Sequence, residues 1–290
     1  MVKLSHSVFA LPFAMIAAFL AGRHLDGRRW PHAGQLALVV LCMVAARSAA
    51  MTFNRIVDAR IDARNPRTAM RPLPGGRLTH VAAWCLFGLS AATFAVGCVG
   101  FQIFYDNPWP ILLSGPVLFY LCFYSFTKRF TRWSHYFLGT AIALSPVAAW
   151  IAVHPASLGV PALLLMATVA CWIGGFDILY ACQDIEVDRA EGLFSLPSRL
   201  GPWGALWVAR ASHAVAVACL IGLGVVCDLG PIYAGGVLLA AALLVVENAL
   251  VRPGDYRRVN VAFFTINGIV SVALAAAAII DVVAWGNAPA

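Results

Sequence analysis

Charged side chains are scarce in this chain. Only 11% of its 290 residues are Asp, Glu, Lys or Arg, while 61% are hydrophobic. A soluble domain of this size carries about 25% charged residues, so the composition excludes a water-soluble globular protein. The mean hydropathy of +0.82 and long apolar runs with few charges are typical of membrane-spanning helices.

Several catalytic motifs are also absent. The sequence contains no CxxC pair, no HExxH, no GxSxG turn, no GxxxxGK[ST] loop and no complete GxGxxG. These absences argue against hydrolase, nucleotide-loop and zinc chemistry. The eight cysteines lie in or at the edges of apolar stretches, where a free thiol behaves as a small hydrophobe.

Nine apolar stretches are long enough to cross a membrane, which takes about 20 helical residues. They lie near residues 6–22, 35–53, 80–101, 109–126, 136–153, 159–182, 204–226, 230–251 and 261–284. The connections between them are short and leave no room for a separate soluble domain. We therefore expect residues 1–290 to form a single all-α, multi-pass membrane domain of about nine helices.

The first apolar stretch has a second interpretation. Lys3, the apolar run and the small-residue segment AFLAG together resemble a secretory signal peptide. Cleavage would leave eight helices and put the later loops on the other side of the membrane. We favour a retained helix, because no later segment forms a domain that would need export.

The formal net charge of +7 can be explained by the side of the membrane on which the basic residues lie. If residue 1 starts in the cytoplasm, nine crossings place most of the 20 lysines and arginines in loops on the cytoplasmic side. That bias is the positive-inside rule. Topology therefore accounts for most of the basic balance, and we expect no nucleic-acid partner.

Two acidic segments lie at the ends of apolar stretches on this side. Asn54, Asp58 and Asp62 follow an i, i+4, i+8 spacing, so a helix would place them on one face. Asp184 and Asp188 repeat the four-residue spacing. The offset from Asp58 to Asp184 equals that from Asp62 to Asp188, which hints at an old internal duplication.

Paired carboxylates at the membrane boundary are costly and repel each other. A divalent cation relieves the repulsion, and Mg²⁺ commonly binds one or two protein carboxylates together with substrate phosphates. Basic residues suited to phosphate oxygens lie nearby: Arg60, Arg64, Arg67 and Arg71 after the first segment, and Lys128, Arg129 and Arg132 after the fourth stretch. The pattern predicts a Mg²⁺-dependent site for a diphosphate with an apolar tail.

Other interpretations remain open. The alternation of Asp58, Arg60, Asp62 and Arg64 could be a solvated face held together by local ion pairs. The charged stripe could also serve an ion- or proton-coupled transporter, or a lipid-binding scaffold without catalysis. Transporters tend to place charges at mid-membrane on broken helices, whereas these carboxylates cluster at one side.

Three motifs resemble the UbiA superfamily of intramembrane prenyltransferases. The first is the family element N-D-x-x-D-x-x-x-D followed by R-T-x-x-R-P, which is matched by Asn54, Asp58, Asp62, Arg67, Thr68, Arg71 and Pro72. The second is D-x-x-x-D, matched by Asp184 and Asp188. The third is Y-S-x-x-K-R, matched by Tyr124, Ser125, Lys128 and Arg129. The chain departs from the pattern at Arg55, where many members have Asp, which removes one possible carboxylate. The resemblance covers the whole chain.

The resemblance implies nine helices around a central cavity that opens to the cytoplasmic side of a bacterial inner membrane, surrounded by membrane lipid. It implies Mg²⁺-dependent transfer of a polyprenyl group from a polyprenyl diphosphate to the ring carbon of an aromatic acid. The acceptor would be 4-hydroxybenzoate or 1,4-dihydroxy-6-naphthoate, in ubiquinone or menaquinone biosynthesis. A non-quinone acceptor is the alternative within the family.

The resemblance also assigns roles to individual residues. Metal would be held by Asn54, Asp58, Asp62, Asp184 and Asp188, and diphosphate by Arg67, Arg71, Lys128 and Arg132. Arg47, inside the second stretch, would bind an acceptor carboxylate or pair with Asp177. Asp177 would in turn support the metal ligands, pair with Arg47 or line the acceptor site. Tyr180 would shield the allylic cation with its ring face.

Overall fold

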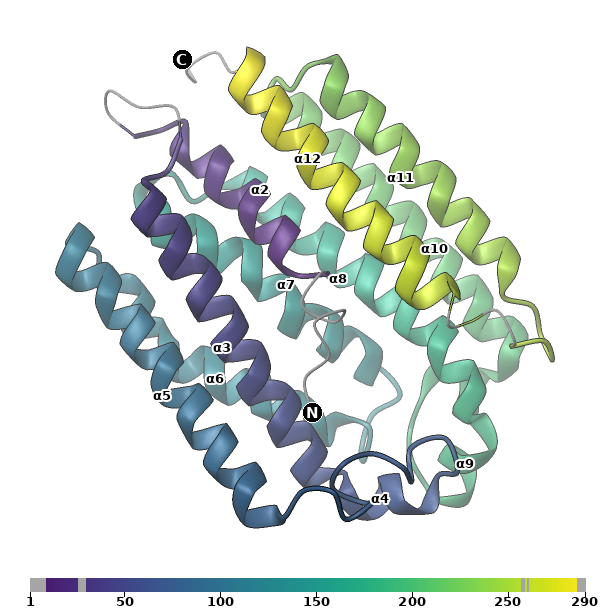
Figure 1. Ribbon diagram of the computed structural model, residues 1–290. Coiled ribbons are helices and arrows are strands. Elements are labelled where there is room, and N and C mark those ends of the chain that lie inside the picture. Colours follow the sequence, from purple (N-terminus) through teal and green to yellow (C-terminus); the bar gives the residue numbers. More distant parts are fainter. Residues whose placement is uncertain (1–8, 26–29, 257–258, 260, 286–290) are drawn as a thin grey trace.

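The regular elements of this chain are helical, which confirms the predicted all-α class. The computed structural model describes residues 9–25, 30–256, 259 and 261–285 (Figure 1). Lys3 and the beginning of the first predicted stretch lie outside the described residues.

Eight helices among the described residues are long and apolar enough to cross a membrane. They are α3 (Ala33–Val57), α5 (His80–Tyr105), α6 (Trp109–Thr127), α7 (Ser134–Val153), α8 (Val160–Ala181), α10 (Leu196–Val226), α11 (Pro231–Leu250) and α12 (Asn267–Trp285). The shorter apolar helix α2 (Leu11–Gly22) occupies the first predicted stretch. The chain is therefore an integral, multi-pass membrane protein, and the predicted count of nine depends on α2.

Local signals in the sequence start several of these helices. Thr79 caps α5 by accepting a hydrogen bond from Ala82 N at 3.2 Å, and Ser195 caps α10 by accepting one from Ser198 N at 3.3 Å. Proline occupies the first turns of α8 and α11, where its missing N–H leaves no helical bond unmade. The Ser195 cap matters for function because it also contacts an acidic motif residue, as described below.

The helices pack side by side in one bundle (Figure 1). Helix α8 packs against α7 and α10, α3 packs against α5, and α2 lies against α7 and α12. Trp150 and Trp172 are fully buried in the core formed by the α2, α7 and α8 region. By contrast, Phe104 and Phe119 of α5 and α6 are about 70% exposed (71% and 70%), as expected for helices that face lipid.

A buried carboxylate joins the last two helices. Asp281 of α12, 1% exposed, accepts hydrogen bonds from Gly230 N at 2.6 Å and Tyr233 N at 3.1 Å at the start of α11. We expect Asp281→Ala to leave these N–H groups unpaired and to destabilise the protein by about 1–3 kcal/mol. The melting midpoint in detergent should fall by several degrees, and Asp281→Asn, which keeps one acceptor, should lose less. An unchanged midpoint for Asp281→Ala would contradict this.

Candidate active site

The first acidic segment lies where α3 gives way to the short helix α4 (Ala59–Arg64). Asn54 is in the last turn of α3, Asp58 ends that helix with φ −93° and ψ 3°, and Asp62 is in α4. The expected continuous helix is therefore interrupted at Asp58. Even so, Asp62 N donates to Asp58 O at 2.8 Å, and both carboxylates are buried, with 3% and 4% exposure.

The second acidic segment lies at the same end of the bundle (Figure 1). Asp184 is in the 3₁₀ turn η2 (Cys182–Asp184), and Asp188 is in α9 (Ile185–Ala190). Asn65 Nδ2 donates to Asp184 Oδ1 at 3.1 Å, and Arg64 pairs with Glu191 at 2.9 Å. Asn65 and Asp184 are 119 residues apart in the sequence. The two acidic segments therefore come from distant parts of the chain and form one site.

Asp58 is surrounded by donors. Lys128 Nζ approaches its Oδ2 to 2.7 Å, Arg129 Nη2 approaches its Oδ1 to 3.1 Å, and Asn54 Nδ2 donates to Oδ2 at 3.1 Å. Arg129 Nη1 is buried without a hydrogen-bond partner in the described part of the chain. A buried donor without a partner costs free energy, and a hydrogen bond from this nitrogen to an anionic ligand would remove that cost.

Asp62 and Asp184 are each held by an arginine of the loop that follows α4. Arg71 Nη1 contacts both oxygens of Asp62, at 2.7 and 2.8 Å. Arg67 donates from Nε to Asp184 Oδ1 at 3.0 Å, from Nη2 to Oδ2, and from Nη1 to Tyr180 Oη at 2.9 Å. Burial lowers the pKa of Arg67, but its bonds to Asp184 outweigh that effect and leave the pKa raised. Arg67 is therefore a permanent cation between the two acidic segments.

Asp188 is held differently from the other three carboxylates. Its Oδ2 accepts a hydrogen bond from Ser195 Oγ at 2.7 Å, so the residue that caps α10 also orients Asp188. Phe194 N, next to that cap, donates to the Lys128 carbonyl at 2.7 Å. These bonds attach the second acidic segment to the basic end of α6.

The local ion pairs considered for the first segment are not the ones that form. Asp58 pairs with Lys128 and Arg129, and Asp62 pairs with Arg71. Arg64 instead reaches Glu191 of the second segment. Asp58 is therefore paired with a distant part of the chain, whereas Asp62 is paired within its own region, with Arg71 and, at 3.9 Å, with Arg55. Because both carboxylates are buried, the segment is not a solvated face.

Arg132 is one of the four residues expected at the diphosphate, and its side chain makes no contact with the acidic residues that the structure describes. Its guanidinium stacks over the Trp133 ring at 5.4 Å, whereas its neighbour Arg129 contacts Asp58. The geometry favours Arg129 for the position in which we expected Arg132. The sequence could have indicated Arg129, because it is the final residue of the Y-S-x-x-K-R element.

This difference gives a matched pair of variants. We expect Arg129→Met to slow diphosphate release from a prenyl diphosphate about 10-fold to 100-fold, since one charge-assisted contact is worth about 1.5–3 kcal/mol. Arg132→Met should remain within about twofold of wild type. Rates measured with saturating Mg²⁺ test the contrast, and a larger loss for Arg132→Met than for Arg129→Met would reverse the assignment.

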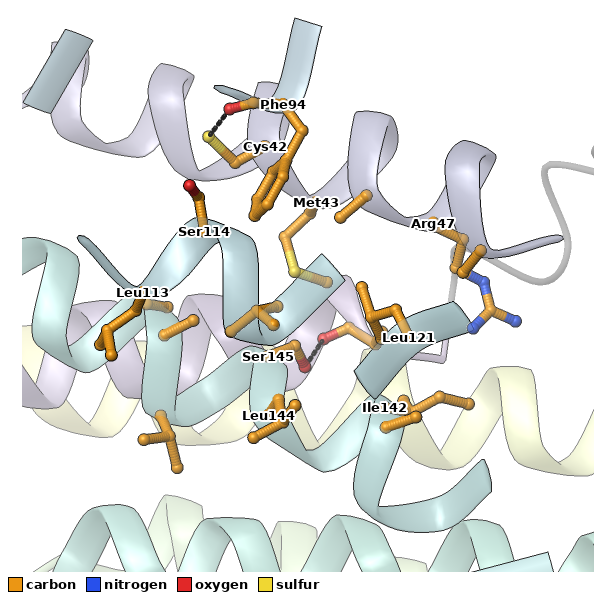
Figure 2. Close-up of a pocket in the computed structure, with 18 of the residues that line it drawn as sticks. Cys42, Met43, Arg47, Phe94, Leu113, Ser114, Leu121, Ile142, Leu144 and Ser145 are labelled. Atoms are coloured by element: carbon orange, nitrogen blue, oxygen red, sulfur yellow. Dashed lines mark hydrogen bonds between the residues drawn. The ribbon is translucent and has the colours of Figure 1, made fainter. Parts of the chain in front are cut away.

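An apolar cavity of about 300 Å³ lies among α3, α5, α6 and α7. Figure 2 shows Arg47 at one end of the cavity and Leu113 and Ser114 toward the other. Apolar side chains make up most of the wall, and Tyr124 lines it together with Arg47. Arg47 Nε is buried and has no hydrogen-bond partner within the described ranges, so its guanidinium can still bind an anionic group.

The alternative pair between Arg47 and Asp177 does not form. Asp177 Oδ2 instead lies 2.7 Å from His135 Nδ1, and Tyr180 contacts Arg67. Tyr180 also packs on Phe263, with 4.4 Å between ring centroids. The structure thus puts Tyr180 at the edge of the Asp184 site, and places Arg47 and Asp177 in separate surroundings.

The donor set can be compared with the needs of Mg²⁺. The acidic residues offer carboxylate and amide oxygens, which hard cations prefer. No group of three or more His, Cys, Asp or Glu residues suited to one metal ion occurs among the residues that the structure describes. The carboxylates fit an ion bound by one or two of them and completed by phosphate oxygens and water, which is the usual Mg²⁺ arrangement.

Comparisons with known proteins agree on one family. Residues 10–269 match the model of the UbiA prenyltransferase family. A 4-hydroxybenzoate octaprenyltransferase from Vibrio parahaemolyticus is 32% identical over 218 residues, covering 75% of this chain and 74% of that protein. One from Methylococcus capsulatus is 31% identical over 244 residues, covering 82% and 77%.

Solved structures show the same fold. A UbiA homologue from Aeropyrum pernix superposes with a TM-score of 0.84 at 31% identity, covering 97% of this chain and 99% of that one. A UbiA homologue from Archaeoglobus fulgidus, bound to GPP and Mg²⁺, has a TM-score of 0.66 at 16% identity, covering 96% and 95%.

Proposed function

Because this chain belongs to the UbiA prenyltransferase family, we propose that it transfers a polyprenyl group from a prenyl diphosphate to the ring carbon of an aromatic acid, in a Mg²⁺-dependent reaction. One observation carries the proposal. Two acidic segments from distant parts of the chain meet at one end of the bundle, interleaved with the basic residues of the site. A site of this composition suits a metal-bound diphosphate.

The basic residues would bind the diphosphate. In the structure their donors are directed to carboxylates: Arg67 to Asp184, Arg71 to Asp62, and Lys128 with Arg129 to Asp58. Arginine and lysine form comparable charge-assisted bonds to phosphate oxygens, so these donors can turn from carboxylate to ligand. Asn54 and the four motif aspartates would hold Mg²⁺, which when bound neutralises charge on the departing diphosphate.

The apolar cavity would hold hydrocarbon, and Arg47 at its end would bind the carboxylate of the acceptor. We propose 4-hydroxybenzoate or 1,4-dihydroxy-6-naphthoate as that acceptor, in ubiquinone or menaquinone biosynthesis. The relatives from Vibrio parahaemolyticus and Methylococcus capsulatus, which bear the name 4-hydroxybenzoate octaprenyltransferase, support the monocyclic acid. We further propose the cytoplasmic face of a bacterial inner membrane, because the basic loops gather at the acidic end of the bundle.

The test uses purified protein in detergent with Mg²⁺ and a radiolabelled prenyl diphosphate. Each aromatic acid is offered separately, and EDTA is the control. Product with one acid, lost in EDTA, would support the function and identify the acceptor. Mg²⁺-dependent diphosphate release without product would retain the prenyl donor and reject both acids. Folded protein that releases no diphosphate would refute the proposal and favour a transporter, for which ion flux in vesicles is the assay.

A further inference from the structure

Arg55 is a cation beside the first acidic segment whose hydrogen-bond donors have no partner in the described chain. It lies in the last turn of α3, and its side chain is 19% exposed. Its Nη1 is 3.9 Å from Asp62 Oδ2, beyond hydrogen-bond distance, and its guanidinium makes no hydrogen bond with any residue that the structure describes. Arg71 Nη1 already holds both oxygens of Asp62. The donors of Arg55 can therefore bind another anion.

The surroundings of Arg55 carry more positive than negative charge. The two carboxylates of the first segment face four cations: Asp58 faces Lys128 and Arg129, and Asp62 faces Arg71 and Arg55. A surplus of one sign attracts a ligand of the other sign. Removing a guanidinium from water without a hydrogen-bonded partner is also costly, so a ligand that brings anionic oxygens to Arg55 would lower that cost.

Arg55 lies between this charged segment and the apolar cavity. Arg47, Met51 and Arg55 follow an i, i+4, i+8 spacing and share one face of α3. The first two line the cavity, with Arg47 at one end of it (Figure 2), whereas Arg55 is beside Asp62. Tyr124 also lines the cavity and is close enough to Arg47 and Arg55 to interact electrostatically with both. A prenyl chain in the cavity would therefore bring its first phosphate toward Arg55.

We propose that Arg55 binds the phosphate group that is attached to the prenyl chain and stabilises its bridging oxygen as that oxygen leaves C1. This inference rests on the proposed function and adds a residue to its donor site. When the C1–oxygen bond breaks, both electrons stay on the oxygen, and no proton moves. A guanidinium that donates parallel N–H bonds to phosphate oxygens neutralises part of the charge that develops there.

The test measures binding without turnover. A prenyl thiodiphosphate, in which sulfur replaces the bridging oxygen, is titrated into wild type, Arg55→Met and Arg55→Lys at saturating Mg²⁺. We expect Arg55→Met to raise the Kd about 10-fold to 100-fold, the usual effect of removing one hydrogen-bonded charge. Arg55→Lys should recover part of the affinity, because it keeps the charge but not the guanidinium fork.

A second ligand locates the contact. A prenyl phosphonate carries a single phosphorus group, joined directly to the chain, and has no terminal phosphate. We expect Arg55→Met to weaken binding of the phosphonate by a factor similar to that for the thiodiphosphate. A loss with the thiodiphosphate alone would place Arg55 at the terminal phosphate and would overturn the assignment.

Arg77 controls for the loss of one positive charge. It lies in the loop between α4 and α5, is exposed, and donates to the Met70 carbonyl. Because exposed charges are screened by salt, Arg77→Met should bind the thiodiphosphate within about twofold of wild type. If Arg77→Met weakens binding as much as Arg55→Met does, the loss reflects net charge, and Arg55 is not a ligand of the phosphate.

Failure of this inference can be distinguished from failure of the proposed function. Asp62 keeps its bonds to Arg71 in Arg55→Met, so we expect this variant to fold, with a melting midpoint near that of wild type. If its folded fraction binds the thiodiphosphate with the wild-type Kd, Arg55 has no role in binding, and the proposed function stands. If wild type itself does not bind the thiodiphosphate in Mg²⁺, the proposed function fails, and the assignment of Arg55 fails with it.

Discussion

Asp184→Asn is expected to slow Mg²⁺-dependent diphosphate release about 10²-fold to 10³-fold, the cost of removing one group that stabilises developing charge. The substitution keeps the shape of the side chain but removes the charge of a proposed metal ligand and weakens the hold on Arg67, whose Nε donates to Asp184 at 3.0 Å. Asp58→Asn should have a comparable effect, because its carboxylate orients Lys128 and Arg129. Release of labelled diphosphate from a prenyl diphosphate measures both.

Glu191 provides the matched control for these variants. It lies close to the same acidic segment but pairs with Arg64, whose side chain is 68% exposed. Exposed ion pairs contribute about 0–1 kcal/mol, so Glu191→Gln should stay within a few-fold of wild type. If Glu191→Gln falls as far as Asp184→Asn, the loss reflects the net charge of the loop and not a specific ligand.

Arg47→Met has the second large expected effect, and that effect should be confined to the acceptor. Without Arg47 the acceptor carboxylate would be buried in an apolar cavity with no cation, at a cost of about 2–5 kcal/mol. We expect kcat/KM for the aromatic acid to fall about 10²-fold to 10³-fold, with acceptor-independent diphosphate release unchanged. Arg47→Lys should recover part of the loss, because it restores charge without the guanidinium fork.

The division between these two activities tests the location of Arg47. It lies seven residues before Asn54 and lines the cavity, whereas Arg67 and Arg71 pair with carboxylates of the acidic segments. If Arg47→Met instead abolishes diphosphate release and leaves the KM of the acid unchanged, Arg47 belongs to the donor site and the acceptor lies elsewhere.

The sequence predicted most of the fold because apolar length alone marks a membrane helix. Eight of the predicted stretches correspond to spanning helices, and the family resemblance is confirmed. The first predicted stretch, residues 6–22, corresponds to α2, which has 12 residues and is shorter than a full span. Helical spacing also placed Asp58 and Asp62 on one face, but it did not predict that α3 would end at Asp58.

The partners of the acidic residues could not be read from spacing. Lys128 and Asp58 are 70 residues apart in sequence and 2.7 Å apart in space, a contact that depends on how α6 packs beside α3. Spacing also could not show which arginine after α6 contacts the acidic residues. Arg129 pairs with Asp58, whereas Arg132, three residues later, lies over the Trp133 ring. His135 carries no motif, and only the packing of α7 against α8 brings it to Asp177.

The most direct test of the central claim is ligand binding without turnover. A prenyl thiodiphosphate, in which sulfur replaces the oxygen that leaves, would be titrated into purified protein with and without Mg²⁺. We predict tight binding that requires Mg²⁺ and that weakens strongly in both Asp58→Asn and Asp184→Asn, because both acidic segments contribute to one site. Binding that is indifferent to Mg²⁺, or that needs only one of the two segments, would contradict a shared metal-dependent diphosphate site.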